Sequence, residues 1–356
     1  MKKAYLVLEN GSVFEGMRIG SEKDSIGELV FTTGVVGYLE TLTDPSYAGQ
    51  IVLQTFPLIG NYGVIKEDFE GTSALNGYIV RELCEEPSNF RSFCKLDDYL
   101  KRASIPGICG VDTRNLTRIL REQGVMNAMI CSEIPQNTDG IRAYRVSDEI
   151  DKLSCKETEQ YPAEGEEKYH VCLMDYGAKH NIVRCLQRRG CRVSVLPCSM
   201  SAEKILALNP DGIMLSNGPG DPADNTCCIE QIRKLIGIKP IFGICLGHQM
   251  LALAMGGQTC KLKYGHRGAN QPVKRLRDGI CFITSQNHGY AVVNESMVGK
   301  AIVSYINAND ASNEGLEYPD LNMFSVQFHP EGCSGPRDTE FLFDHFIGLM
   351  GGNSNA

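Results

Sequence analysis

The sequence predicts an α/β protein made of two domains. Its 356 residues exceed the usual length of one domain, and two is the default at about 100–200 residues per domain. A polar, acidic segment without hydrophobic periodicity, residues 157–168, separates two regions of different pattern. Strand-like runs dominate before this segment, whereas strands and helices alternate after it. We therefore expect domains at residues 1–156 and 169–356, joined by a linker at 157–168.

The N-terminal region favours strands. Apolar runs at residues 4–8, 29–33 and 51–54 are separated by turns rich in glycine and asparagine. One helix is expected at 112–123, because Asp112 and Thr113 can cap its start and Gly124 can end it. These features predict a separate β-rich α/β domain.

The C-terminal region alternates between the two kinds of element. Strands are expected at residues 169–175, 192–196, 212–215 and 239–244, and helices at 179–189, 202–208, 229–236 and from the end of the last strand to about 255. Strands that alternate with helices of this length form a parallel sheet covered on both faces. We therefore expect a mostly parallel open sheet with helices on both sides.

Composition and charge exclude several classes of protein. Apolar residues make up 42% and charged residues 22%, which is an ordinary globular balance and excludes wholesale disorder. No run of 18 apolar residues exists, so no membrane span is expected. The net charge of −8, without a basic stripe, argues against nucleic-acid binding. The first residues enter a strand without an apolar leader, and the 15 scattered cysteines lack any C-x-x-C pair. We expect a cytoplasmic protein whose thiols are mostly reduced and buried.

The strongest local motif is Gly243-Ile244-Cys245-Leu246-Gly247, between an expected strand and an expected helix. This is the pattern of a nucleophile elbow with cysteine in place of serine. The N-terminus of the following helix has a positive dipole end, which favours the thiolate. The alternative is a buried structural thiol, as we expect for Cys109 in the near-match 107–110. The position between strand and helix favours Cys245 as a nucleophile.

A thiol nucleophile needs a base, and the base needs an orienting group. His329 follows the strand-like segment 322–328, and Glu331 lies two residues further on. Side chains at this spacing in extended chain point to the same side, so Glu331 can hold one tautomer of His329. An ordinary loop histidine is the alternative, but Cys245 favours a triad Cys245–His329–Glu331. His248 is expected on the helix surface.

The turn at residues 216–221 (SNGPGD) follows the third expected strand and faces the same sheet edge as Cys245. Its glycines let backbone N–H groups approach a ligand, which suits an oxyanion hole completed by the Leu246 N–H. A plain tight turn is the alternative. The chain has no G-x-x-x-x-G-K-[ST] motif and the turn has no G-x-G-x-x-G, so no nucleotide is placed on this chain. No H-E-x-x-H motif or paired Cys/His spacing indicates a metal either.

With these residues in place, the chain resembles the class I glutamine amidotransferases, through residues 243–249 (GICLGHQ) and 329–331 (HPE). More narrowly, it resembles the family of small, glutamine-hydrolysing subunits of carbamoyl-phosphate synthetase over residues 1–350. The further matching segments are 43–47, 60–63, 110–118, 175–181, 216–222, 265–270 and 286–290. The N-terminal segments select this family among the amidotransferases.

The resemblance implies which residues bind substrate. L-glutamine would be held at Ser46, Gly218, Gly220, Leu246, Gln249, Asn287, Gly289 and Tyr290. Ser46 would bring part of the glutamine site from the first domain. The sequence departs from the family at Tyr290, where Phe is frequent, and at Phe328, where a small residue is common. Neither departure touches the triad.

The resemblance also implies the reaction. Cys245 would attack the glutamine amide, His329 would protonate the leaving ammonia, and the glutamyl thioester would be hydrolysed. Ammonia would pass to a large subunit that makes carbamoyl phosphate from bicarbonate, with ATP and Mg, for arginine and pyrimidine biosynthesis. No cofactor is expected on this chain, and a heterodimer that can assemble further is expected.

Two other readings remain open from the sequence. Another class I amidotransferase would share the C-terminal half, and residues 110–118 together with Ser46 argue against it. A non-catalytic relative would lack part of the triad, whereas all three residues are present here.

Overall fold

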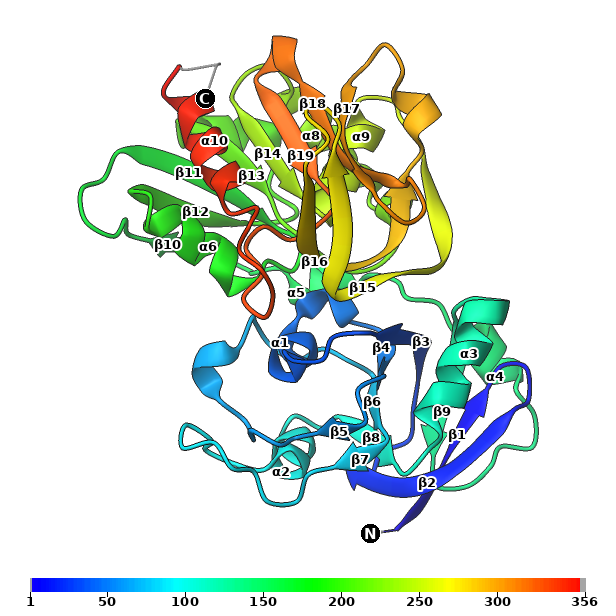
Figure 1. Ribbon diagram of the computed structural model, residues 1–356. Helices are drawn as coiled ribbons and strands as arrows, with labels where there is room; N and C mark the ends of the chain where they lie inside the picture. The colour runs from blue at the N-terminus through cyan, green and yellow to red at the C-terminus, as the bar shows by residue number, and fades with distance from the viewer. Residues whose placement is uncertain (1, 353–356) are drawn as a thin grey trace. The chain divides into compact units, whose positions relative to one another are not determined.

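The computed structural model describes residues 2–352, and the chain divides into two compact units, Met1–Ser147 and Asp148–Ala356 (Figure 1). The division falls before the expected linker. Within that linker, β10 (Glu159–Tyr161) pairs antiparallel with β12 (Cys191–Pro197) in the sheet of the second unit. The linker expectation is therefore corrected. β10 is a short edge strand with mostly exposed polar side chains, so it carries no apolar alternation that a sequence pattern could detect.

The first unit is built on a closed barrel of seven strands in the order β1-β2-β8-β6-β4-β3-β9. The barrel strands are β1 (Lys3–Leu8), β2 (Val13–Gly20), β3 (Ser25–Thr32), β4 (Gln50–Gln54), β6 (Gly77–Val80), β8 (Pro106–Cys109) and β9 (Met126–Cys131). A separate two-stranded sheet contains β5 (Leu58–Ile59) and β7 (Glu82–Leu83). The barrel closes where β1 pairs with β9, strands from opposite ends of this unit's sequence.

Helices and helical turns connect the barrel strands. They are α1 (Tyr38–Thr43), η1 (Pro45–Tyr47), η2 (Lys66–Asp68), α2 (Leu96–Arg102), α3 (Thr113–Gln123) and α4 (Asp139–Ala143). The predicted helix at 112–123 is present as α3. It begins as its cap indicates, since Asp112 Oδ1 accepts a hydrogen bond from Asn115 N at 3.0 Å.

The second unit contains a ten-stranded sheet in the order β10-β12-β11-β13-β14-β19-β18-β17-β15-β16. Its further strands are β11 (Tyr169–Asp175), β13 (Gly212–Leu215), β14 (Ile241–Ile244), β15 (Thr259–Arg275), β16 (Cys281–Val292), β17 (Ile302–Asn307), β18 (Asn313–Tyr318) and β19 (Met323–Val326). The five neighbouring strands from β12 to β19 are parallel, and the rest pair antiparallel. The α/β class is confirmed. The antiparallel extension was not predicted, because β15 is largely polar and partly exposed.

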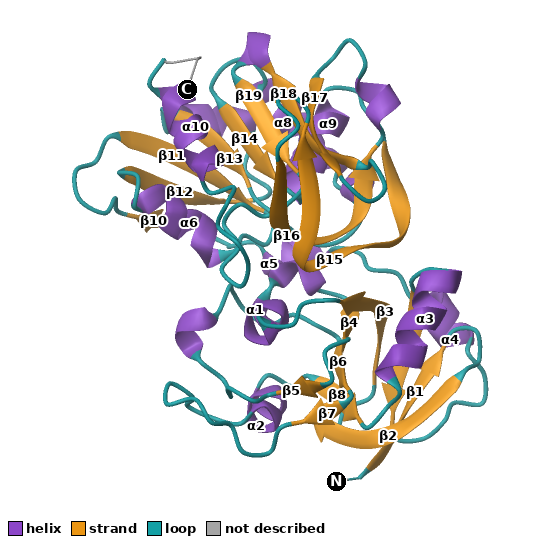
Figure 2. Ribbon diagram, viewed as in Figure 1, coloured by secondary structure: helices purple, strands orange, loops and turns teal. Residues whose placement is uncertain are grey.

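Helices cover both faces of the parallel strands (Figure 2). They are α6 (His180–Gln187) and α10 (Phe341–Met350) on one face, and α7 (Ala202–Ala207), α8 (Thr226–Leu235) and α9 (Leu246–Ala254) on the other, with α5 (Glu149–Leu153), η3 (Pro222–Asp224), η4 (Asn294–Met297) and η5 (Pro319–Leu321) in the connections. Alternation along β11 explains the two layers. Val171 and Leu173 pack toward α6 and α10, whereas Cys172 and Met174 pack toward the opposite helices.

The parallel arrangement brings several chain segments to one edge of the sheet. Strands β11, β13, β14 and β19 are neighbours in that order, so their carboxyl ends lie side by side. Ligands of open α/β sheets bind outside this edge. Among the described residues, no helix is long and apolar enough to cross a membrane.

Candidate active site

Cys245 occupies the sharp turn between β14 and α9. Its φ of 54° and ψ of −103° are unusual for a residue that carries a side chain, and such strain is typical of functional sites. The Cys245 N–H donates to Val326 O at 2.9 Å, which ties the turn to the end of β19. The residue is only 2% exposed. The predicted nucleophile therefore lies at the carboxyl edge of the sheet and at the N-terminus of α9.

The two glycines around Cys245 are required by space. A β-carbon at Gly247 would lie 2.4 Å from Leu215 O, and one at Gly243 would lie 2.9 Å from the carbonyl carbon of Gly247. Both distances are well inside van der Waals contact, and the opposing atoms belong to the backbone. The motif therefore needs glycine at both positions because α9 lies very close to β13 and β14.

His329 and Glu331 form the second part of the site. His329 Nδ1 lies 2.6 Å from Glu331 Oε1, and both residues are buried. The His329 N–H donates to Ser285 O at 2.9 Å, which fixes the loop after β19 against β16. His329 Nε2 has no hydrogen-bond partner of ordinary geometry within residues 2–352. The Cys245 sulfur lies 3.6 Å from Asn287 O, so the thiol is directed at that carbonyl.

The charges in this cluster favour a protonated His329. Burial and Lys179 lower the pKa of His329, but Glu331 and Cys245 outweigh them and raise it to about 10. Burial raises the pKa of the Glu331 carboxyl, but the attraction of His329 and Lys179 has the larger effect, so the pKa is lowered overall. A buried imidazolium held by a buried carboxylate is the arrangement that stabilises a neighbouring thiolate.

Two residues that sequence reasoning did not assign also contact Glu331. Lys179 Nζ lies 4.0 Å from Glu331 Oε1, and its side chain is 8% exposed. Asn181 Nδ2 donates to the Glu331 carbonyl oxygen. Both residues follow the carboxyl end of β11, which places them at the catalytic edge. Their position one loop after a parallel strand was the available sequence signal, because functional residues of such sheets concentrate there.

The turn at residues 216–221 lies directly against the start of α9. The Gly247 N–H donates to Ser216 O at 3.0 Å. A β-carbon at Gly218 would lie 2.3 Å from Tyr176 O, and Gly220 has a φ of +87°. Leu246 is the first residue of α9, and the first amides of a helix have no internal acceptor. The turn at 216–221 and the N-terminus of α9 are therefore neighbours, and the oxyanion hole expected from this turn and the Leu246 N–H stays a prediction.

The other residues expected to bind glutamine within the second unit are also brought together. Gln249 Nε2 donates to Tyr290 O at 2.8 Å and to Gln327 Oε1 at 2.9 Å. Asn287 provides the carbonyl near the Cys245 sulfur, and Gly289 lies between Asn287 and Tyr290 on β16. Gln327 is completely buried and was missed by the sequence analysis. It immediately follows β19, the same kind of position as Lys179.

Ser46 lies in η1 of the first unit and is buried. Its backbone N–H donates to Asp44 Oδ1 at 2.9 Å. Its role toward glutamine stays a prediction.

His248 was expected on the surface of its helix, but it is completely buried, and its Nδ1 lies 2.8 Å from Ser325 Oγ. Burial lowers the pKa of His248 to about 3, because α9 is enclosed by the sheet and neighbouring elements. Phe328 is buried and packs edge-on against Tyr305 at 5.5 Å between ring centroids.

Comparison with known proteins gives matches over both units. Residues 172–349 match the family "Glutamine amidotransferase class-I", and residues 6–130 match "Carbamoyl-phosphate synthase small chain, CPSase domain". The carbamoyl phosphate synthase small chain of Bacillus caldolyticus is 49% identical over 98% of this chain and 96% of its own length. That of Listeria monocytogenes serotype 4b (strain F2365) is 48% identical over 100% of this chain and 99% of its own length.

A third relative, the carbamoyl phosphate synthase small chain of Oceanobacillus iheyensis, is 49% identical over 98% of this chain and 96% of its own length. These similarities extend across the N-terminal barrel and the C-terminal sheet alike, so they cover more than the amidotransferase fold. The chain therefore belongs to the carbamoyl phosphate synthase small-chain family and carries a class I glutamine amidotransferase domain.

Proposed function

We propose that this chain hydrolyses L-glutamine and delivers the ammonia to the large subunit of a carbamoyl phosphate synthase. The observation that carries the chemistry is the buried His329–Glu331 pair next to Cys245 at a strained strand-to-helix turn. The family membership selects the acceptor subunit. ATP, Mg²⁺ and bicarbonate are used on that subunit, and its product serves arginine and pyrimidine biosynthesis.

The first half-reaction forms a thioester. The Cys245 thiolate attacks the amide carbon of glutamine, while the Leu246 N–H and the turn at 216–221 stabilise the negative charge on the amide oxygen. His329 donates its proton to the amide nitrogen, so the C–N bond breaks and ammonia leaves. Glu331 stabilises the imidazolium until this proton is transferred.

The second half-reaction releases glutamate. His329, now neutral, accepts a proton from a water molecule that attacks the thioester carbon. The C–S bond breaks, glutamate leaves, and the thiolate–imidazolium pair is restored. Gln249, Asn287, Gly289 and Tyr290 are the residues of the second unit that we propose to hold the amino-acid end of the substrate, and the family resemblance adds Ser46 of the first unit as a prediction.

The test is the variant Cys245→Ser in the assembled enzyme with its large subunit. Glutamine-dependent synthesis should be lost, because a serine hydroxyl does not form the nucleophilic anion at neutral pH. Synthesis from added ammonium should be kept, because the thiol serves only glutamine hydrolysis. The control is Cys260→Ser, an exposed thiol on β15 of the same unit, which should keep both activities. Glutaminase activity of Cys245→Ser comparable with the unchanged protein would contradict the proposal.

A further inference from the structure

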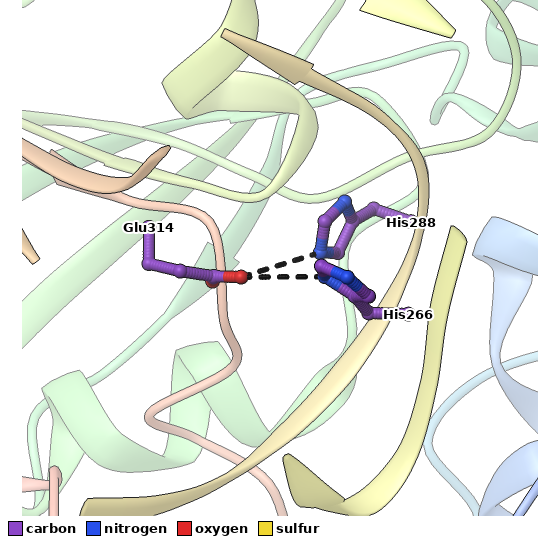
Figure 3. A group of neighbouring side chains, drawn as sticks. All are labelled: His266, His288 and Glu314. Carbon is purple, nitrogen blue, oxygen red and sulfur yellow. Dashed lines mark ion pairs between the residues drawn. The ribbon is translucent and has the colours of Figure 1, made fainter. Parts of the chain in front are cut away.

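A second cluster of ligand-type side chains lies in the antiparallel part of the second unit. His266 on β15, His288 on β16 and Glu314 on β18 are all buried and converge from three strands (Figure 3). His266 Nδ1 lies 3.4 Å from Glu314 Oε1, and His288 Nε2 lies 3.9 Å from the same oxygen. The two nitrogens and the oxygen lie within 4.8 Å of one another. Two atoms bound to one metal ion at about 2.1 Å lie about 3–4 Å apart, and the separations of 3.4 and 3.9 Å from Glu314 Oε1 fall in that range.

In both histidines, the ring nitrogen that points away from Glu314 has a hydrogen-bond partner. His266 Nε2 lies 2.9 Å from Asp310 Oδ2, and His288 Nδ1 lies 2.7 Å from Tyr290 O. Histidines that bind metals almost always place their second ring nitrogen against a carboxylate or a backbone carbonyl. This contact fixes the ring and leaves the other nitrogen directed into the cluster. Here both histidines direct that nitrogen toward Glu314.

Two oxygen atoms that can accept hydrogen bonds lie near His288 Nε2. The Tyr290 carbonyl can only accept, so the proton of a neutral His288 is on Nδ1 and its Nε2 carries a lone pair. Gln286 Oε1 lies 3.2 Å from Nε2, and the amide orientation of Gln286 is set because its Nε2 donates to Glu314 Oε2 at 3.0 Å. His288 Nε2, Gln286 Oε1 and Glu314 Oε1 therefore face one another in a buried space. A cation between them would satisfy all three.

We propose that His266, His288 and Glu314 form a binding site for a divalent first-row transition-metal ion such as Zn²⁺ or Co²⁺. Two imidazoles and one carboxylate are the ligand types that such ions accept, whereas Mg²⁺ and Ca²⁺ require mostly oxygen. Short-spaced sequence motifs predicted no metal, because these ligands come from three strands and are separated by more than twenty residues each.

Metal binding must replace the present contacts of one side chain. Asn307 Nδ2 lies 3.3 Å from Glu314 Oε1 and 3.4 Å from His266 Nδ1, and these long contacts would be replaced.

The cluster is connected to the proposed glutamine site through one atom. The Tyr290 carbonyl oxygen accepts from His288 Nδ1 and from Gln249 Nε2. An ion that immobilises His288 would also fix the position of Tyr290 and its neighbours on β16. Resting on the proposed function, we expect the bound ion to change the KM for glutamine more than kcat.

The experiment is a titration of the purified full-length chain with Co²⁺ alone, followed by its visible absorption. One saturable Co²⁺ should bind with a spectrum of nitrogen and oxygen ligands and without sulfur-to-cobalt charge transfer, which separates this site from the cysteines. Glu314→Gln should abolish that binding. The matched control is Glu317→Gln on the same strand, which lies on the opposite face of β18 and should bind as the unchanged protein does.

A second variant keeps the test decisive if Glu314→Gln does not fold. Asp310→Asn leaves all three ligands in place and removes the carboxylate behind His266, so Co²⁺ affinity should fall about 10- to 100-fold. The proposal is overturned if the unchanged chain binds no saturable Co²⁺, if the spectrum shows thiolate ligation, or if both variants bind Co²⁺ as tightly as the unchanged chain. None of these readouts depends on glutaminase activity, so the two proposals can fail separately.

Discussion

His329 Nδ1 lies 2.6 Å from Glu331 Oε1, and neither residue is more than 2% exposed. A carboxylate can only accept, so the proton between them is on Nδ1, and Nε2 is left to exchange a proton with the thiol and the substrate. The geometry therefore assigns an orienting and charge-stabilising role to Glu331.

Replacing Glu331 by Gln should lower glutaminase kcat by about 10²- to 10⁴-fold, the usual range for a disabled acid–base group. The amide keeps the size of the side chain but not its charge, so the imidazolium is no longer stabilised. Steady-state glutamine hydrolysis measures the effect, and circular dichroism checks the fold. A variant that retains its kcat would remove Glu331 from the mechanism.

The pH dependence of glutamine hydrolysis follows from the raised pKa of His329. In the unchanged protein His329 keeps its proton until the pH rises through about 10, so activity that needs this proton declines only there. Without the Glu331 charge, burial and Lys179 still lower the pKa, and the decline should begin at lower pH. Profiles of kcat/KM for both proteins test this, and an unchanged alkaline limb in Glu331→Gln would contradict it.

Gly247→Ala should destabilise the second unit by about 1–3 kcal/mol, the cost of forcing a group into a packed space. The new methyl would lie 2.4 Å from Leu215 O, so α9 must move away from β13 and take Cys245 with it. Thermal unfolding should show a lower Tm together with reduced glutaminase activity. Gly140→Ala is the control, because a β-carbon there meets no atom within 4 Å.

Gln327→Leu should raise the KM for glutamine without a matching loss of kcat. The variant removes the acceptor that holds Gln249 Nε2 at 2.9 Å, and a neutral hydrogen bond contributes about 0.5–1.5 kcal/mol, or roughly 2- to 12-fold in affinity. Gln187→Leu, on the half-buried side of α6, serves as the control. If KM stays at its original value, Gln249 is held adequately by Tyr290 O alone.

The parts of the site that the sequence predicted are those with short-range signatures. Gly243 and Gly247 are four residues apart and both allow the close contact between α9 and its neighbouring strands. His329 and Glu331 are two residues apart in extended chain. Both patterns can therefore be recognised within a short stretch of sequence. Lys179 and Gln327 were missed because their contacts depend on which strands become neighbours in the sheet. His248 was misjudged because a polar side chain on a helix was expected at its surface, whereas α9 is apolar on nearly all sides and is buried all round.

The fold shows the same division. Alternating apolar strands and helices predicted the parallel strands, since a strand covered on both faces is a continuous apolar run, as in β11. The barrel of the first unit was not predicted, because the pairing of β1 with β9 and of β4 with β6 joins distant segments. Nothing in the composition of these four strands indicates which strand each one pairs with.

Closure of that barrel restricts how the first unit can recognise another protein. Each of its seven strands has a neighbour on both sides, so the barrel offers no row of free backbone groups for an incoming strand to extend. A partner that binds the barrel must therefore contact side chains on its outer surface or the connecting segments, which include the two-stranded sheet of β5 and β7. Complementary substitutions there could redirect the choice of partner while the barrel's hydrogen-bonded framework stays intact.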